Sequence, residues 1–129
     1  MQTTAIIWFR RDLRIFDNHT LSYAAKEGFR IVPVYIWAPG EDGEWAPGSA
    51  SRWWLQKSLE SLSSSLENIG LRLIIRRGKS FDEIGRLINE TGAKVVCWNR
   101  LYEPLAKERD KQIETQLSND GLVVKSFNS

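Results

Sequence analysis

Charged side chains that could bind an anion follow two of the apolar runs in this sequence. Arg10 and Arg11 follow the first run, and Arg100 and Glu103 follow the fourth. Guanidinium groups bind carboxylates and phosphates, whereas a carboxylate accepts hydrogen bonds from ring N–H groups. In open parallel sheets, ligands bind beyond the carboxyl ends of the strands, where the strand order reverses. If the two runs form neighbouring strands at the point where the order reverses, the crevice between their ends suits an anionic ligand.

The residues around the first of these points also allow a purely structural interpretation. The alternating charges could form an ion-pair network around a tight turn, in which Asp17 or Asn18 caps the helix that follows. That network would contain Arg10, Asp12, Arg14 and Asp17. The structural interpretation is favoured for Asp12, Arg14, Asp17 and Asn18, and both roles stay open for Arg10.

Five β-rich apolar runs alternate with stretches of helical periodicity, which indicates a series of βαβ units. Strands are expected at 5–9, 31–37, 71–76, 94–98 and 122–127. A glycine precedes each strand after the first, as suits the left-handed position after a helix end. These glycines are Gly28, Gly70, Gly92 and Gly121. Nearly continuous apolar strands are typical of a parallel sheet with helices on both faces, so the sequence predicts a three-layer α/β domain.

Two of the expected helices have an apolar stripe at helical spacing, which predicts a face packed on the sheet. The first stripe consists of Leu55, Leu59, Leu62, Leu66 and Ile69. The second consists of Phe81, Ile84, Leu87 and Ile88.

Length and composition restrict the function further. A chain of 129 residues has room for one domain, and a formal charge of +2 is too small for a dedicated nucleic-acid binder. Cys97 is the single cysteine and His19 the single histidine, so the residues indicate neither a disulfide, a zinc site nor a hydrolytic triad. Cys97 is expected to be a small buried strand residue. Without an apolar leader, the chain is expected to be cytoplasmic.

Nucleotide hydrolysis finds no support in the glycine-rich segments. Residues 43–48 have the spacing of a phosphate loop but continue with Ser49 and Ala50, where lysine and serine or threonine are required. A basic cluster consists of Arg76, Arg77 and Lys79. A solvated group of charges is the favoured interpretation of this cluster, with an anion site as the alternative.

The long irregular segment at 38–48 exceeds an ordinary βα loop of about 2 to 6 residues, which suggests a function. Trp45 lies in it and has two open interpretations: an apolar pin for the loop, or a stacking surface for a planar ligand. Among the six tryptophans, Trp8, Trp98 and at least one of Trp53 and Trp54 are expected to pack around the sheet. Adjacent helix positions cannot both share one face.

Several segments resemble the DNA photolyase and cryptochrome family. They are WFRRDLR at 8–14, VYIWAP at 34–39, SRWWL at 51–55, WNRLYEP at 98–104 and SFN at 126–128. Together they extend over essentially the whole chain. The SRWWL and LYEPL stretches are most similar to plant-type cryptochromes and the bacterial photolyases related to them.

This resemblance implies a Rossmann-like domain with a five-stranded parallel sheet of order 3-2-1-4-5, which binds the antenna chromophore of a blue-light flavoprotein. Methenyltetrahydrofolate is the expected chromophore, with a deazaflavin or FMN as alternatives. FAD and damaged DNA are expected to bind a C-terminal helical domain outside these 129 residues, so the chain alone should not repair pyrimidine dimers. A cryptochrome photoreceptor module and a stand-alone α/β nucleotide-binding protein are the alternatives, and no membrane partner is expected.

The resemblance also implies a set of residues around the antenna chromophore. Trp37 and Trp45 are the two tryptophans expected to enclose a planar pterin ring. The full set expected to line the site is Arg10, Arg11, Trp37, Trp45, Arg52, Arg100 and Glu103. Neither a catalytic residue nor a metal ligand is expected.

Overall fold

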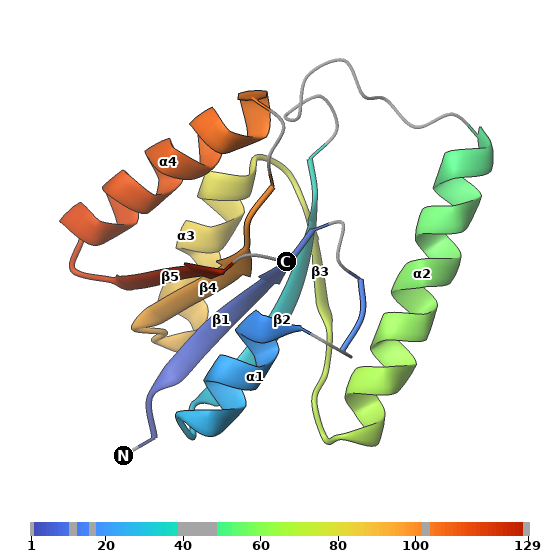
Figure 1. Ribbon diagram of the computed structural model, residues 1–129, viewed down its shortest axis with the longest axis horizontal. Helices are drawn as coiled ribbons and strands as arrows, with labels where there is room; N and C mark the ends of the chain where they lie inside the picture. The colour runs from blue at the N-terminus through green and yellow to red at the C-terminus, as the bar shows by residue number, and fades with distance from the viewer. Residues whose placement is uncertain (1, 11–12, 16–17, 39–48, 102–103, 128–129) are drawn as a thin grey trace.

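The computed structural model describes residues 2–10, 13–15, 18–38, 49–101 and 104–127, which alternate between strands and helices (Figure 1). The strands are β1 (Thr4–Phe9), β2 (Arg30–Trp37), β3 (Ile74–Arg77), β4 (Val95–Asn99) and β5 (Val123–Phe127). The helices are α1 (His19–Lys26), α2 (Ser49–Asn68), α3 (Ser80–Thr91) and α4 (Pro104–Asn119). The predicted βαβ series is confirmed.

All neighbouring strands pair in parallel, in the order β3-β2-β1-β4-β5. The expected order is therefore confirmed. Strand β1 lies at the centre, and the chain first builds outward through β2 and β3 and then through β4 and β5. The strand order reverses between β1 and β4, where Ala5 lies opposite Val95 and Trp8 opposite Trp98.

Two apolar cores, one on each face of the sheet, form a three-layer domain. Because successive strand residues point to opposite faces, Ile6 and Trp8 enter one core and Ile7 and Phe9 the other. Helices α3 and α4 cover the first face, and α1 and α2 cover the second (Figure 1). Every residue of β1 is buried, as expected for a central parallel strand.

Several apolar residues expected in the core are exposed, which corrects the sequence interpretation. The exposed fractions are 54% for Ile69, 38% for Phe81, 55% for Trp53 and 65% for Trp54. Ile69 follows the end of α2, so it no longer continues the helical stripe. Among the residues of α2 whose burial is described, the buried apolar ones are Leu62 and Leu66, both in its C-terminal half. The two tryptophans lie in its N-terminal half, and at about 3.6 residues per turn Trp53 is on the side of the helix opposite Leu62.

Strand bounds agree with the prediction to within one residue, except at β3. That strand was expected from Leu71 but begins at Ile74, because its ladder with β2 starts at Val34 and Ile74. The Leu71 amide instead donates to the Leu66 carbonyl at 2.8 Å and closes the end of α2. The four glycines expected after helices all have positive φ, including Gly92 at 71° after α3.

Asn18 begins α1 as its N-cap, which confirms one of the two expected caps; Asp17 lies outside the described residues. The Asn18 side-chain oxygen accepts from the Leu21 amide and from Asn99 Nδ2, both at 3.1 Å. Thr20 Oγ1 also donates to Asn99 Oδ1 at 2.5 Å. These buried bonds attach the start of α1 to the carboxyl end of β4.

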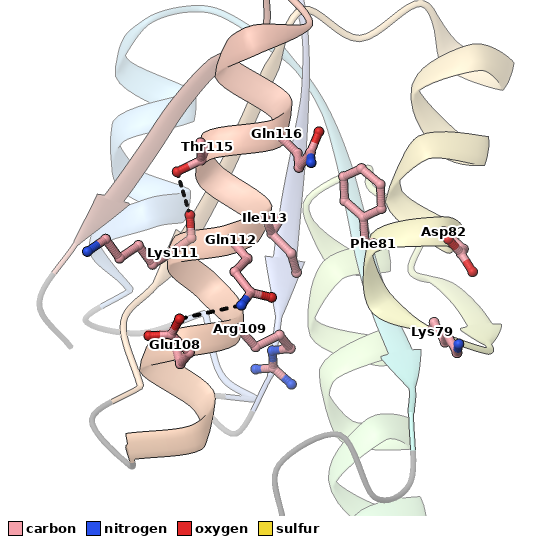
Figure 2. A pocket seen from close by; sticks show the side chains of 10 residues that line it. All are labelled: Lys79, Phe81, Asp82, Glu108, Arg109, Lys111, Gln112, Ile113, Thr115 and Gln116. Atoms are coloured by element: carbon pink, nitrogen blue, oxygen red, sulfur yellow. Dashed lines mark hydrogen bonds between the residues drawn. The ribbon is translucent and has the colours of Figure 1, made fainter.

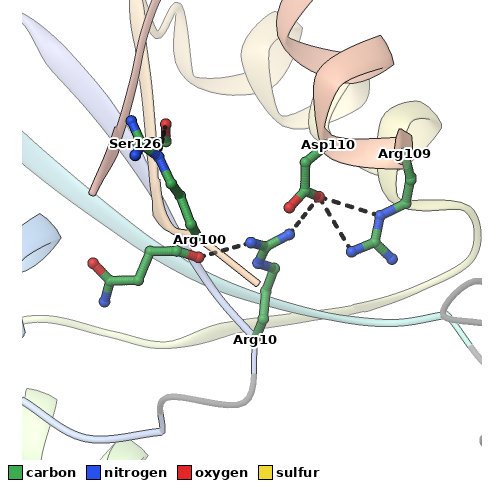
Figure 3. Close-up of polar contacts among 6 residues, drawn as sticks. Arg10, Arg100, Arg109, Asp110 and Ser126 are labelled. Carbon is green, nitrogen blue, oxygen red and sulfur yellow. Dashed lines mark hydrogen bonds and ion pairs between the residues drawn. The ribbon is translucent and has the colours of Figure 1, made fainter. Parts of the chain in front are cut away.

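A buried ion pair connects the end of β1 to α4 (Figure 3). Arg10 Nη1 lies 2.5 Å from Asp110 Oδ1, and Arg10 Nη2 donates to the Asn99 carbonyl at 2.7 Å. Arg109 also contacts Asp110 Oδ1, at 3.2 Å. The Arg10 guanidinium carbon lies 4.5 Å from the centre of the Trp8 ring. The central strand, β4 and α4 therefore meet at one charged group.

Among the described residues, none of the helices has an apolar stretch long enough to cross a lipid bilayer.

Cys97 is fully buried in β4, and burial raises the pKa of its thiol to about 12. The pKa of an ordinary thiol is close to 9.0, so the folded state retains the proton that the unfolded state loses. Its contribution to stability is therefore complete below pH 9.0 and is lost as the pH rises toward 12. We expect the free energy of unfolding to fall by about 1 kcal/mol more in the wild type than in Cys97→Ala between pH 8 and 10. Urea titrations at several pH values measure this difference, and equal slopes for both proteins would contradict it.

The stability of the protein should fall when the Arg10–Asp110 pair loses one partner. Asp110→Ala leaves a buried guanidinium without its carboxylate, so we expect a loss of about 3 to 5 kcal/mol in the free energy of unfolding. The apolar double variant Arg10→Met/Asp110→Leu should lose less, because the buried Arg10 charge is removed together with its partner and only the Arg109 contact with Asp110 is lost. Urea denaturation measures the free energy of unfolding of both variants. Glu108→Ala, on the exposed side of α4, is the control. If Asp110→Ala were as stable as the control, the ion pair would contribute nothing to the stability of the fold.

Candidate functional site

The two described arginines at the switch point between β1 and β4 have different surroundings. Arg10 is buried and bound to Asp110 and the Asn99 carbonyl. Arg100 is exposed, and its Nε donates to Ser126 Oγ at 3.1 Å, on the neighbouring strand β5 (Figure 3). Both side chains therefore contact other parts of the protein, and their role toward a ligand stays a prediction.

Other predicted residues at this edge of the sheet lie outside the described part of the chain. They are Arg11, Asp12, Asp17, Trp45 and Glu103, together with most of the segment at 38–48. Their roles also stay predictions.

A groove between the end of β2 and α2 brings two of the predicted site residues together. Trp37 is the last residue of β2, and Arg52 lies in the first turns of α2. Both line this groove, which has a volume of about 560 Å³ and which we call the β2–α2 groove. Its other lining residues are Leu55, Gln56, Leu59, Glu60, Ser63, Ser64 and Ile75. Of all these residues, only Trp37 and Arg52 were predicted from the sequence to bind a ligand.

Both apolar and polar side chains line the β2–α2 groove. Trp37, Leu55 and Leu59 are half-buried, and Ile75 is exposed on β3. Arg52 and Glu60 add one charge of each sign from the same helix. The surface thus combines a partly exposed aromatic ring, aliphatic neighbours and a few polar groups, which is the usual composition of a site for a small organic ligand.

Contacts around Glu60 are long and open to solvent. Gln56 Nε2 donates to Glu60 Oε1 at 3.3 Å, and Lys57 Nζ lies 3.8 Å from Glu60 Oε2. The Glu60 side chain is 56% exposed. Such contacts are weak and readily exchanged, so the carboxylate can accept from a ligand instead.

Trp53 and Trp54 form an exposed pair beside Arg52 on α2. Their ring centres are 5.4 Å apart in an edge-to-face arrangement, and Lys57 Nζ lies 5.8 Å from the centre of the Trp53 ring. Neither tryptophan is among the described residues that line the β2–α2 groove. Trp8 and Trp98, by contrast, pack edge to face in the core as expected.

A second groove, of about 570 Å³, lies between α3 and α4 on the opposite face of the sheet (Figure 2). Phe81 and Ile113 are its apolar residues, whereas most of the other side chains are charged or amide-bearing. The sequence did not predict this groove, because the helical spacing of Phe81 placed it in the core. Charges of both signs line it, so it offers no uniform potential to an anion.

The basic cluster near the start of α3 is partly neutralised within the fold. Arg76 binds both carboxylate oxygens of Glu90, at 2.7 and 3.0 Å. This hydrogen bonding raises the pKa of Arg76 and lowers that of Glu90. With Arg76 paired and Arg77 and Lys79 exposed, the arrangement supports the solvated-charge interpretation over an anion site.

Comparison with known proteins identifies the family. A sequence model of the family described as DNA photolyase matches residues 5–129. Cryptochrome-2 of Arabidopsis thaliana is 44% identical over 129 residues, which are 99% of this chain and 21% of that protein. The deoxyribodipyrimidine photo-lyase of Agrobacterium fabrum is 45% identical over 122 residues, 95% of this chain and 25% of that protein.

Solved structures show the same fold at high similarity. A bacterial class III photolyase from Agrobacterium tumefaciens superposes with a TM-score of 0.91 at 43% identity, over 99% of this chain and 26% of that one. An archaeal photolyase from Sulfolobus tokodaii, solved with two FAD molecules, has a TM-score of 0.86 at 28% identity. The match covers 98% of this chain and 29% of that one.

The chain thus spans about a quarter of the length of these relatives. Its similarity to plant cryptochromes and to a bacterial photolyase agrees with the branch that its sequence motifs indicated. Since the family match extends over nearly every residue and the fold agrees, this chain belongs to the DNA photolyase family.

Proposed function

We propose that this chain is the light-harvesting domain of a DNA photolyase and that its β2–α2 groove binds the antenna chromophore. The observation that supports this most directly is the position of Trp37 and Arg52. These two residues, 15 positions apart, were predicted from the sequence as ligand contacts, and they line one groove of about 560 Å³. Ligand sites in proteins commonly measure about 300 to 1,000 Å³.

The groove suits methenyltetrahydrofolate, which has a planar pterin ring and a carboxylate tail. Trp37 provides an aromatic surface against which a planar ring can stack, and Leu55, Leu59 and Ile75 provide apolar contacts. Arg52 can pair with a carboxylate through two parallel hydrogen bonds. A deazaflavin or FMN also contains a planar ring and an anionic group, so these features alone do not select among the three.

In the proposed light-harvesting function, the protein binds and orients the chromophore. The bound chromophore absorbs light and passes its excitation to a flavin. Stacking on Trp37 fixes the plane of the ring, and the charge of Arg52 fixes which end of the ligand lies toward the start of α2. Both functions require a rigid frame, which the sheet provides through β2, paired on both edges with β1 and β3. No proton or electron transfer is assigned to residues of this chain.

The repair chemistry is assigned to the rest of the parent protein. We propose that a C-terminal helical domain binds FAD and damaged DNA and splits pyrimidine dimers by electron transfer. The chain covers only 25% of the photo-lyase it matches, which leaves room for such a domain in the parent. Photolyase is chosen over a cryptochrome photoreceptor because the structure with a TM-score of 0.91 is a photolyase.

Arg10, Arg11, Trp45, Arg100 and Glu103 remain proposed contacts from the carboxyl edge of the sheet. Arg10 and Arg100 are both occupied by contacts within the protein. Their contribution to binding should therefore be smaller than that of Trp37 and Arg52.

The test is titration of the purified chain with methenyltetrahydrofolate, followed by the absorbance of the bound chromophore and by quenching of tryptophan fluorescence. Trp37→Ala should weaken binding about tenfold or more, because it removes both stacking and apolar contact. Trp53→Ala is the matched control, since Trp53 is exposed on α2 and does not line the groove. Circular dichroism checks that each variant is folded. Equal affinity in Trp37→Ala and the wild type, or no binding by either, would exclude this groove as the antenna site.

A further inference from the structure

We propose that Glu60 makes the β2–α2 groove selective for a pterin chromophore over a flavin-type one. This inference rests on the proposed function, which places the chromophore in that groove. It goes further by naming the ligand class and the side chain that selects it. The similar archaeal photolyase was solved with two FAD molecules, so a flavin is a real alternative for a family member.

The groove has opposite charges at two separated positions of α2. Arg52 and Glu60 both line it and are eight residues apart in the helix. At about 1.5 Å per residue, this separates their backbone positions by roughly 12 Å along the helix axis. A ligand that uses both residues must therefore be extended, with an anionic group toward Arg52 and a hydrogen-bond donor toward Glu60.

Glu60 is the only carboxylate among the described residues that line this groove. It has a hydrogen bond from Gln56 at 3.3 Å and an ionic contact with Lys57 at 3.8 Å, and neither contact is short. An ionised carboxylate offers hydrogen-bond acceptors only. Whatever polar edge a ligand presents to Glu60 must therefore contain donors.

The ring edges of the candidate chromophores differ in this respect. A 2-amino-4-oxo-pterin presents two adjacent donors, the N3–H and the 2-amino group, which match the two oxygens of one carboxylate. A flavin or deazaflavin presents a single N3–H between two carbonyl groups. A carboxylate bound to that N3–H places its second oxygen against a carbonyl oxygen, which is repulsive. A polar mismatch of this kind lowers the affinity for the mismatched ligand, by less at an exposed site than at a buried one.

The discrimination should depend on Glu60 rather than on Arg52. The Arg52 guanidinium pairs equally well with a folate carboxylate or a flavin phosphate. Trp37 stacks on any planar ring of suitable size. Of these three lining groups, the carboxylate is thus the one that distinguishes between the two ligand classes.

The experiment measures the affinities of the full chain and its variants for methenyltetrahydrofolate and FMN by fluorescence quenching and calorimetry. Glu60→Gln should bind the folate about tenfold more weakly, because a charge-assisted pair becomes a mismatched amide contact at a partly exposed site. Its preference for the folate over FMN should narrow by a similar factor. Glu67→Gln is the control, since Glu67 is exposed on the same helix and does not line the groove.

A folate analogue with a methyl group in place of the 2-amino group tests the contact itself. The wild type should bind this analogue about tenfold more weakly than the parent folate, whereas Glu60→Gln should bind both with similar affinity. This coupling would not arise if Glu60 only stabilised α2.

Three results would overturn the inference. The first is unchanged folate affinity in Glu60→Gln while Trp37→Ala still loses binding, which leaves the proposed function intact. The second is wild-type affinity for FMN equal to that for the folate. The third is no folate binding by the wild type, which overturns the proposed function as well.

Discussion

Burial of both faces of β1 is the constraint on which the rest of this fold depends. All six residues of the strand are buried, so helices must cover the sheet on two sides and the chain must cross over between its halves. The same burial continues into Arg10, directly after the strand. A guanidinium there requires a carboxylate partner, which Asp110 provides from α4. Hydrophobic packing thus determines the layers, and one buried ion pair attaches α4 to the carboxyl end of β1.

The candidate site lies where α2 is less deeply packed on the sheet, since Leu55 and Leu59 are only half-buried. The C-terminal half of the helix packs through Leu62 and Leu66, whereas its N-terminal half carries Arg52 and the exposed tryptophan pair. Trp37, at the carboxyl end of β2, faces the same groove. A rigid strand end and a partly packed helix therefore form an open surface beside the core, and Leu59 belongs to both.

Family membership connects this geometry to a function without supplying the ligand. The chain is 45% identical to a photo-lyase and 44% identical to a plant cryptochrome, and it covers about a quarter or less of either. In the function we propose, Trp37 stacks on the ring, Arg52 pairs with an anionic group and Glu60 selects the ring edge.

The sequence by itself determined the local structure and the order of elements. Apolar runs predicted the strands and the glycines predicted the helix ends, because each depends on local chain geometry. The apolar run around Cys97 also predicted that it is a buried strand residue. Motif resemblance also predicted the strand order and selected Trp37 and Arg52. Only the tertiary structure decided that Phe81, Ile69 and both adjacent tryptophans are exposed, that Asp110 pairs with Arg10, and that Glu60 shares a groove with Trp37. Periodicity shows which residues share a helix face, but which part of that face is buried is set by packing between distant segments.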